Sequence, residues 1–307
     1  MKLLKFILKR VVVSVIMIFC LVTISFFLVK LIPGSPFTSE KMQAGNKAAI
    51  YAYYGLDKPV YEQYFTYMKN LLHGDLGTSY KIRGVTVNEI IRTAFPYSLD
   101  LGMRAVAFAL TMGLLLGIVA AYQRGKAMDT FTMIVAIIGT SVPSFIMGFF
   151  VQYLFAVKLK WFPPAEYTSF AHTVLPTFAL GLGMLATIAK YTRTSMLEVI
   201  SSDYVKTADA KGLSKFRIIV GHQLRNALMP IITLLGPMIA SVITGTFVVE
   251  NVFAIPGLGR HYVTSVQGLD YTLITGLTIF FAAFLVLMNL LVDIVYALID
   301  PRIGLVE

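Results

Sequence analysis

The sequence contains six predominantly apolar stretches of about 20 residues or more, and this feature most restricts its fold. As a helix, a stretch of this length crosses roughly 30 Å of hydrocarbon. Backbone groups in a bilayer must bond within their own segment, and the stretches lack the alternation of barrel strands. The sequence therefore predicts an all-α membrane protein with six transmembrane helices. They are expected at residues 11–32, 98–122, 131–157, 174–191, 228–249 and 272–298.

The composition of the 307-residue chain leads to the same class of protein. Hydrophobic residues make up 57% and charged residues 14%, with a mean hydropathy of +0.76. The net charge of +10 is interpreted as a topology signal, and a soluble nucleic-acid-binding module is excluded. The single cysteine, Cys20, excludes an intrachain disulfide framework and a cysteine-based metal cluster. No metal site is expected, because the histidines are scattered over loops: His73, His172, His222 and His261.

The distribution of Lys and Arg predicts the orientation of the six helices. With the N-terminus in the cytoplasm, the cytoplasmic side holds 14 of the 26 basic residues. The segment 33–97 is discounted because segments beyond about 60 residues cross the membrane regardless of charge. The opposite side then holds only 3 basic residues. Both termini are therefore expected in the cytoplasm.

Three regions follow from these spans. Residues 1–32 form the N-terminal segment and first helix, 33–97 form a small, partly helical external cap, and 98–307 hold the other five helices. A cytoplasmic loop at 192–227 joins the fourth helix to the fifth. The cap is rich in tyrosines that either face a partner protein or take a structural role, in a core or as an aromatic belt at the headgroup level. They are Tyr51, Tyr53, Tyr54, Tyr61, Tyr64 and Tyr67.

The cytoplasmic loop holds a short predicted helix. Ser202 and Asp203 are favourable N-caps, residues 204–211 suit a helix, and Gly212 is the expected left-handed residue that ends it. Ser214 is expected to cap a second helix that leads to the fifth span. A helix of about eight residues is marginal alone in water, so it must dock on another surface.

Two docking surfaces are compatible with this short helix. Tyr204, Val205 and Ala208 share one face, and the small Ala208 and Ala210 permit close approach to a groove in a partner protein. The alternative is an interfacial helix on anionic lipid, because interfacial and docking helices share one pattern. Its basic contacts would be Lys206, Lys211, Lys215 and Arg217.

The loop resembles the cytoplasmic coupling loop of bacterial ABC importer permeases. The consensus of that loop has Glu-Ala-Ala, three residues and Gly; with Gly212 as the Gly, Ala208 is the last Ala, whereas Lys206 and Thr207 depart from the pattern. The peptide-importer branch fits better, with its Tyr-Val-x-Thr-Ala-x-Ala-Lys-Gly-Leu string at 204–213. A His-x-Leu-Arg-Asn-Ala-Leu string follows at 222–228.

Further strings extend the resemblance along nearly the whole chain, to the B-type permease subunit of oligopeptide or dipeptide ABC importers. They are Leu-Ile-Pro-Gly at 31–34, Tyr-Gly-Leu-Asp-Lys-Pro at 54–59, Gly-Asp-Leu-Gly-Thr-Ser at 74–79, Val-Pro-Ser-Phe at 142–145, Phe-Val-Val-Glu at 247–250, Ile-Pro-Gly-Leu-Gly at 255–259 and Asp-Pro-Arg at 300–302.

The resemblance implies a permease subunit of the bacterial cell membrane, forming half of a peptide path. Its implied partners are a C-type permease subunit, two cytoplasmic ATP-binding subunits, an extracytoplasmic peptide-binding protein and the lipid bilayer, with no cofactor. Relatives also carry nickel, so the substrate stays open. The residues expected to couple to the ATPase are Tyr204, Ala208, Asp209, Ala210 and Gly212.

Motifs for chemistry in the chain itself are absent from the sequence. It has no Gly-x-x-x-x-Gly-Lys-Ser/Thr phosphate loop, so energy must come from another subunit or an ion gradient. An ion-driven transporter complete in one chain is the second hypothesis, although no internal repeat is visible. An intramembrane hydrolase with Ser141 or Ser144 as nucleophile ranks third, because the histidines lie outside the spans. No catalytic residue is expected.

Polar residues inside the spans are the remaining candidates. Asp100 and Arg104 are expected to pair on one helix face and neutralise each other. Asp293 with Asn289 marks a polar face of the sixth helix, where anchoring of the helix end is favoured. Hydroxyls of the fifth helix are the expected lining of the translocation path, although small residues there suit close packing equally well. They are Thr233, Ser241, Thr244 and Thr246.

Overall fold

The computed structural model describes residues 2–33, 37, 44–244 and 247–299, and over these ranges the chain is almost entirely helical. A single antiparallel bridge between Thr78 and Thr86 is the β-type contact in this described part. The helices, with η marking π-helical turns, are α1 Lys2–Leu31, α2 Ala44–Tyr53, α3 Val60–Leu72, α4 Val87–Tyr122, α5 Ala127–Ser141, α6 Ser144–Val151, η1 Gln152–Lys158, α7 Phe170–Ile200, α8 Asp203–Ala210, α9 Lys215–Ile218, η2 Ile219–Leu224, α10 Arg225–Ala227, α11 Met229–Thr244, α12 Phe247–Val252, α13 Leu258–Gly268 and α14 Tyr271–Ile299.

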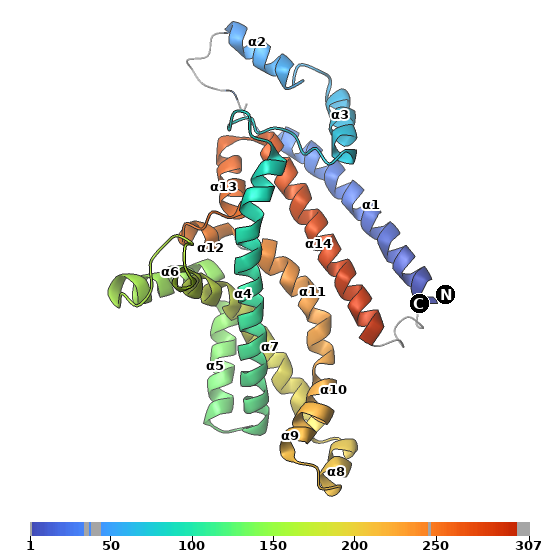
Figure 1. The fold of residues 1–307 in the computed structure, drawn as a ribbon, viewed down its shortest axis with the longest axis vertical. Coiled ribbons are helices and arrows are strands. Elements are labelled where there is room, and N and C mark those ends of the chain that lie inside the picture. Colours follow the sequence, from blue (N-terminus) through green and yellow to red (C-terminus); the bar gives the residue numbers. More distant parts are fainter. Residues whose placement is uncertain (1, 34–36, 38–43, 245–246, 300–307) are drawn as a thin grey trace.

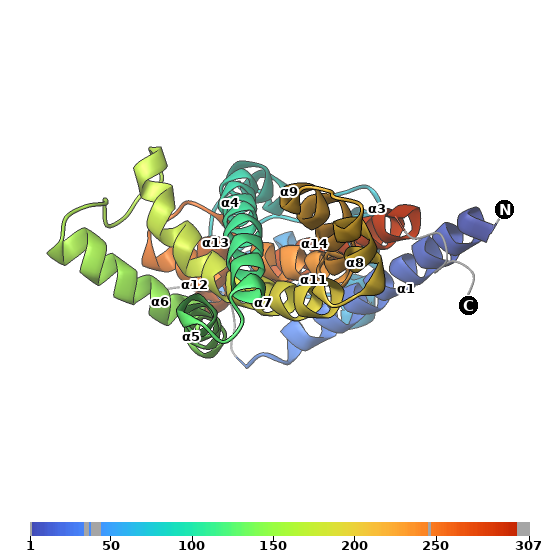
Figure 2. The ribbon, with the colours of Figure 1, turned by 90° about the horizontal axis from the view of Figure 1, so that it is seen from below.

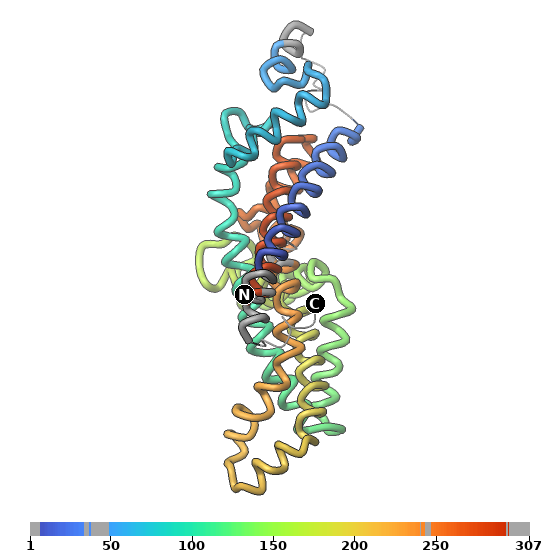
Figure 3. The backbone as a smooth tube through the Cα atoms, turned by 90° about the vertical axis from the view of Figure 1, so that its right-hand side faces the viewer, coloured from blue at the N-terminus to red at the C-terminus, as the bar shows by residue number. Residues whose placement is uncertain are grey.

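The molecule is elongated, with different short helices at its two ends (Figures 1 and 3). Helices α2 and α3 lie at one end, called here the cap end, and α8 and α9 lie at the other, called the loop end. Helix α4 runs between them and packs along α7, while α1 packs along α14. Seen from the loop end, α6 projects sideways from the bundle (Figure 2).

Close packing of α4 on α7 rests on small residues at every fourth position of α4. A Cβ atom on Gly113 would lie 2.8 Å from Cγ2 of Ile188, and one on Gly117 would lie 2.5 Å from Cβ of Thr192. Small residues at this spacing let two helix backbones approach in a membrane, where van der Waals contact drives association. The series is Ala105, Ala109, Gly113, Gly117 and Ala121, and all five are buried.

Four described helical segments are long and apolar enough to cross a membrane: Ile7–Leu31, Val87–Tyr122, Phe170–Ile200 and Tyr271–Val292. Two bent pairs pass the same test together, Ala127–Ser141 with Ser144–Lys158 and Lys215–Ala227 with Met229–Ile239. The described chain therefore has four helices that could span a membrane, or up to six if each bent pair is one span. The all-helical membrane class predicted from the sequence is confirmed.

The third predicted span, 131–157, is wrong as a continuous helix. Helix α5 ends at Ser141, and the chain turns by 109° before α6. Pro143 lacks an N–H group and disfavours helical geometry at the residue before it. Val142 accordingly adopts an extended conformation, with φ −91° and ψ 120°. The apolar run at 131–157 hides this break because the helices on both sides of it are apolar.

Other predicted boundaries also move. Helix α4 begins at Val87 rather than 98, because Thr86 caps it by accepting a hydrogen bond from the Glu89 N–H at 3.2 Å. The predicted cap at 33–97 therefore loses its last residues to α4. Helix α7 is longer at both ends than the predicted span 174–191. The fifth predicted span, 228–249, is divided between α11 and α12.

The cap tyrosines divide between the two roles left open by the sequence. Tyr64 and Tyr67 hold α3 on α1, with ring centroids 5.4 Å and 5.7 Å from that of Phe26. Tyr54 contacts the rings of Phe37 and Tyr80. Tyr53 is 81% exposed, and Tyr61 is also exposed. The inner tyrosines therefore build the cap, and the outer ones remain free to face lipid or protein.

We expect Gly117→Val to lower the free energy of unfolding by about 1–3 kcal/mol, because the added atoms overpack the α4–α7 contact. Valine gains only a few tenths of a kcal/mol in helix propensity over glycine. The midpoint of thermal unfolding in detergent measures the change. Gly221→Val is the matched control, since a Cβ on Gly221 meets no atom within 4 Å. An unchanged midpoint for Gly117→Val would contradict the packing role.

Candidate functional site

The candidate site is the turn of chain at the loop end, from Asp203 to Ala227. Helix α8 runs from Asp203 to Ala210, so the predicted short helix is confirmed. Gly212 has φ +74°, the left-handed conformation expected of it. Its N–H donates to the Asp209 carbonyl at 2.8 Å, and the Leu213 N–H donates to the Ala208 carbonyl at 3.3 Å. This pair of bonds is a Schellman ending, which gives the helix a defined stop.

The inner face of α8 packs on its own chain. Val205 and Ala208 are buried, and they form a small cluster with Ile218 of α9 that Val199 and Leu213 cover. The sequence pattern predicts that Val205 and Ala208 lie on the face that docks on a partner. In the structure, both side chains instead pack against Ile218 of the same chain. The physical reason is that a short helix is marginally stable alone, and burying its apolar residues against its own chain stabilises it whether or not a partner is bound.

The outer face of α8 carries three of the five predicted coupling residues. Tyr204 is 42% exposed, and Asp209 and Ala210 are exposed as well. Phe216 of the following helix α9 is 75% exposed. Sequence reasoning missed Phe216; the available signal was an aromatic residue directly after the Ser214 cap, on a helix whose inner side is filled by Ile218.

Specific contacts fasten the loop to the long helices. The Asn226 side-chain amide donates to the Tyr204 hydroxyl at 2.9 Å, which joins α8 to α10. The Tyr122 hydroxyl at the end of α4 donates to the buried Gln223 of η2. Ala227 of α10 is fully buried in a cluster with Ala121 of α4 and Met196 of α7. The loop is therefore attached to α4 and α7 through polar and apolar contacts.

An ion pair braces the neighbouring helices near the loop end. Arg193 of α7 donates to both carboxylate oxygens of Asp129 in the first turn of α5, at 2.5 Å and 2.9 Å. The Gly125 N–H donates to the same carboxylate at 2.9 Å. The Asp129 side chain is only 8% exposed. Since a buried carboxylate is costly without partners, this pair sets the position of α5 against α7.

The basic side chains of the loop keep the lipid alternative open. Lys206, Lys211, Lys215 and Arg217 are all exposed. Lys206 pairs with Asp203 at 2.9 Å, at a site where both side chains are mostly exposed, so this pair adds little stability. The geometry alone fits a partner protein or an anionic surface.

The predicted hydroxyls of the translocation path lie along α11 as far as the structure describes them. Thr233 and Ser241 are exposed, and their hydroxyls donate to the Met229 and Met238 carbonyls at 3.1 Å and 2.9 Å. Thr233 lines a cavity of about 330 Å³ between α1, α11 and α14. Thr244 ends α11, and its side chain lies outside the described part, as does Thr246 altogether. Their role in the path stays a prediction.

The predicted pair of Asp100 and Arg104 is confirmed. The Arg104 Nε donates to Asp100 Oδ2 at 2.8 Å, and the Tyr167 hydroxyl donates to the same oxygen at 2.7 Å. The side chain of Asp293 lies outside the described part, and Asn289 lines the cavity that contains Thr233. Among the described residues, no group of three His, Cys, Asp or Glu side chains is arranged to hold a metal ion.

A buried carboxylate that the sequence analysis did not single out joins distant segments. Glu250 of α12 is fully buried; it accepts the Ser98 hydroxyl of α4 at 2.6 Å and the Gly259 N–H of α13 at 2.7 Å. A Cβ on Gly257 or Gly259 would collide with this carboxylate. The Ile-Pro-Gly-Leu-Gly string at 255–259 is therefore the turn that closes around Glu250.

A second buried carboxylate lies at the start of α14. Asp270 is fully buried and accepts the Ser79 hydroxyl at 2.5 Å, the Tyr80 N–H at 3.1 Å and the Leu273 N–H at 3.2 Å. It caps α14 and fixes the loop after α3 on that helix. Contacts between residues far apart in the sequence, such as Ser79 and Asp270 with a separation of 191 positions, leave no signal in a local sequence pattern.

Comparison with known proteins places this geometry in a family. The family model described as "binding-protein-dependent transport system inner membrane component" matches residues 113–305, and the model of its N-terminal part matches residues 3–102. The chain belongs to this family. The two matched regions together cover the loop end, the Glu250 turn and α1.

Close relatives span the chain from end to end. The dipeptide transport system permease protein DppB of Bacillus subtilis is 46% identical over 305 residues, 98% of each chain. The oligopeptide transport system permease proteins OppB of Haemophilus influenzae and Escherichia coli are 43% and 40% identical over 303 residues, 98% of this chain and 99% of theirs. The resemblance to peptide-importer permeases expected from the sequence is confirmed.

Solved structures share the fold at low sequence identity. An inward-facing structure of the MetNI methionine ABC transporter has a TM-score of 0.54 and 15% identity, covering 69% of this chain and 96% of that one. An amino acid ABC transporter with histidines has a TM-score of 0.51 and 16% identity, covering 70% and 94%. These structures show that the fold is shared, whereas the family assignment rests on the family models and on the relatives described above.

We expect Arg193→Met to lower the free energy of unfolding by about 3–5 kcal/mol, because it leaves the Asp129 carboxylate buried without its cation. Replacing both partners, as Asp129→Leu with Arg193→Met, is expected to cost markedly less. Thermal unfolding of the single and double variants in detergent forms a double-mutant cycle. A double variant as unstable as the sum of the two singles would show that the pair is not coupled.

Proposed function

We propose that this chain is the B-type permease subunit of an ATP-driven importer for peptides. The observation that carries the proposal is the end-to-end similarity to relatives named as dipeptide and oligopeptide permease proteins. A subunit that receives force from an ATPase needs an exposed surface with a firm attachment behind it. The outer face of α8 is exposed, and its inner face packs on α9 and α7. As a permease subunit it is not an enzyme, and ATP hydrolysis belongs to partner subunits.

The proposed arrangement has six spans, with each bent helix pair counted once. Both termini and the loop end then lie in the cytoplasm, and the cap end lies outside, as the distribution of Lys and Arg favours. The partners are a C-type permease subunit, two cytoplasmic ATP-binding subunits and an extracytoplasmic peptide-binding protein. The complex resides in a bacterial cell membrane.

Force would travel from the ATPase to the long helices in two steps. The ATPase contacts Tyr204, Asp209 and Ala210 on the outer face of α8 and the exposed Phe216 of α9. Helix α8 passes the displacement to α9 and α7 through Val205 and its buried neighbours. The Tyr122–Gln223 bond and the Ala227 cluster pass it to α4. Helix α8 therefore transmits motion and performs no chemistry.

The peptide path would run along α11. Thr233 and Ser241 give this helix an exposed polar side, and Pro237 lies within the helix between them. Hydroxyls already bonded to their own helix offer only weak further contacts, and a conduit must release what it binds. Short peptides are the proposed substrate class, because the relatives are named for dipeptides and for oligopeptides.

The ion-driven alternative lacks comparable support. A secondary transporter complete in one chain favours inverted repeats and carboxylates at the membrane midplane. In the described part of the chain, the two fully buried carboxylates, Glu250 and Asp270, are occupied by hydrogen bonds to Ser98, Gly259 and Ser79. They serve the fold rather than ion binding.

Gly212→Val is expected to uncouple ATP hydrolysis from uptake while the protein stays in the membrane. Valine at φ +74° is strained by about 1–2 kcal/mol, so the Schellman ending loosens and α8 loses its direction. Peptide uptake and ATPase activity are measured together in proteoliposomes that contain the whole importer. Uptake per ATP hydrolysed should fall at least tenfold.

Two variants of the same loop serve as comparisons for that assay. Gly221→Val introduces the same side chain where no atom lies within 4 Å and should leave coupling intact. Phe216→Ser removes the exposed aromatic ring of α9 without changing the backbone, and it should weaken association with the ATPase. Normal uptake by a well-expressed Gly212→Val variant would count decisively against the coupling role.

A further inference from the structure

A cavity of about 340 Å³ lies at the cap end, between α1, the cap and α14. Its volume falls within the range of sites for small ligands. Phe26, Val29 and Lys30 line it from the last turns of α1, and Tyr271, Thr272 and Thr275 line it from the first turns of α14. The apolar span of α1 ends at Leu31, and that of α14 begins at Tyr271. The cavity therefore lies at one boundary of the membrane, at the depth of lipid headgroups.

Lys30 brings a positive charge into this cavity without a matching carboxylate. Its ammonium donates to the side-chain oxygen of Gln63 at 2.5 Å and lies 5.6 Å from the centroid of the Phe26 ring. Within the described ranges of the chain, no salt bridge involves Lys30. A partly buried ammonium that has only a neutral amide and a ring as partners is a favourable binding group for an anion.

Tyr67 of α3 adds a hydrogen-bonding group without a described partner to the lining of this cavity. Its hydroxyl is buried, and no described residue forms a hydrogen bond with it. Burial raises the pKa of Tyr67, so the phenol stays protonated and able to donate. A buried hydroxyl without a partner costs about 1–3 kcal/mol, which a bound acceptor would recover.

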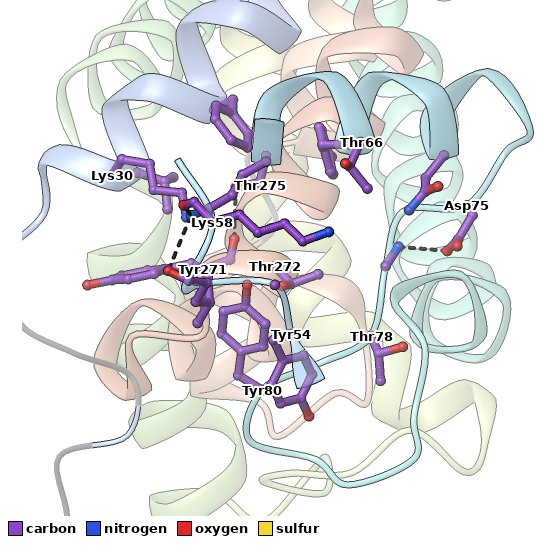
Figure 4. A pocket seen from close by; sticks show the side chains of 18 of the residues that line it. Lys30, Tyr54, Lys58, Thr66, Asp75, Thr78, Tyr80, Tyr271, Thr272 and Thr275 are labelled. Atoms are coloured by element: carbon purple, nitrogen blue, oxygen red, sulfur yellow. Dashed lines mark hydrogen bonds between the residues drawn. The ribbon is translucent and has the colours of Figure 1, made fainter. Parts of the chain in front are cut away.

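Charges of opposite sign face each other across the cavity (Figure 4). Lys30 and Asp75 lie on opposite sides, and the Lys58 side chain extends between them. One Asp75 oxygen accepts the Gly77 N–H at 2.8 Å, which fixes the carboxylate. Two ammonium groups and one carboxylate in a single cavity match a small group that carries an anion at one end and a cation at the other.

We propose that this cavity binds the headgroup of a phospholipid with a primary ammonium group, such as phosphatidylethanolamine. The phosphate would accept hydrogen bonds from Lys30, Lys58 and the Tyr67 hydroxyl, and the ammonium would face Asp75. The position of the cavity at the ends of two membrane spans favours a lipid over a soluble phosphate, because the acyl chains can remain in the bilayer beside α1. The bound headgroup would tie α3 of the cap to α1 and α14.

Native mass spectrometry of the full-length chain in detergent tests this site. Phosphatidylethanolamine, phosphatidylcholine, inorganic phosphate and a dipeptide are added separately at equal concentration. We expect one phosphatidylethanolamine retained per chain, and weaker retention of phosphatidylcholine because its ammonium carries no hydrogen. Lys30→Met with Lys58→Met should weaken retention roughly a hundredfold, since each charged hydrogen bond contributes about a factor of ten. Lys69→Met, on the exposed side of α3 outside the cavity, is the matched control.

Two milder variants keep the test decisive if the double lysine variant does not fold. Tyr67→Phe retains the ring and should weaken retention roughly two- to tenfold by losing one hydrogen bond. Asp75→Asn should remove the preference for phosphatidylethanolamine over phosphatidylcholine. Equal lipid retention in the folded variants and the Lys69→Met control would overturn the proposal. Displacement of the lipid by inorganic phosphate or by the dipeptide would overturn it as well, because the site would then serve a soluble anion or peptide.

Discussion

The close contact between α4 and α7 is the constraint on which the rest of the structure depends. Lipid tails are as apolar as leucine side chains, so two helices associate in a membrane only if their surfaces fit closely. Ala105, Ala109, Gly113 and Gly117 provide that fit because they let the backbone of α7 approach α4. Helix α5 joins the same unit through Asp129 and Arg193. The loop end is attached to α4 and α7, so whatever displaces the loop acts on this packed unit.

Buried polar contacts of Glu250 in α12 and of Asp270 before α14 complement this apolar packing. Glu250 and Asp270 each collect hydrogen bonds from segments that are far apart in the sequence, Ser98 in one case and Ser79 in the other. Such contacts are strong inside a protein and costly when half satisfied, so they specify one arrangement of α12, α13 and α14 against α4. The two ends of the molecule thus differ. The cap end is fixed by the buried Asp270, which holds the loop after α3 on α14, whereas the loop end offers an exposed face on a firm support.

Local signals account for what the sequence predicted correctly. Ser202 and Gly212 mark the start and the end of α8, and Asp100 lies four residues before Arg104. These features involve neighbours within one or two helical turns. Hydropathy found the apolar segments but treated the run across Pro143 as one helix, because the break changes the direction of the chain while both sides of it are apolar. The inward face of α8 depends on Ile218 and Val199, and a short helix cannot reveal its neighbours by periodicity. The small residues at every fourth position of α4 are visible in the sequence, but they did not enter the prediction. The contacts of Glu250 join residues too far apart for any local pattern to indicate them.

The central claim is that the loop and the α4–α5–α7 unit move as one body when ATP is hydrolysed. Electron-spin distance measurement in the assembled importer tests it, with labels at the exposed Lys126 before α5 and the exposed Lys211 directly after α8, in a Cys20→Ser background. The account predicts the same distance distribution in the ATP-free, ATP-bound and ADP-bound states of an importer that remains active. A distance that changes with the nucleotide would show that the loop moves independently of the helices, and would contradict the account.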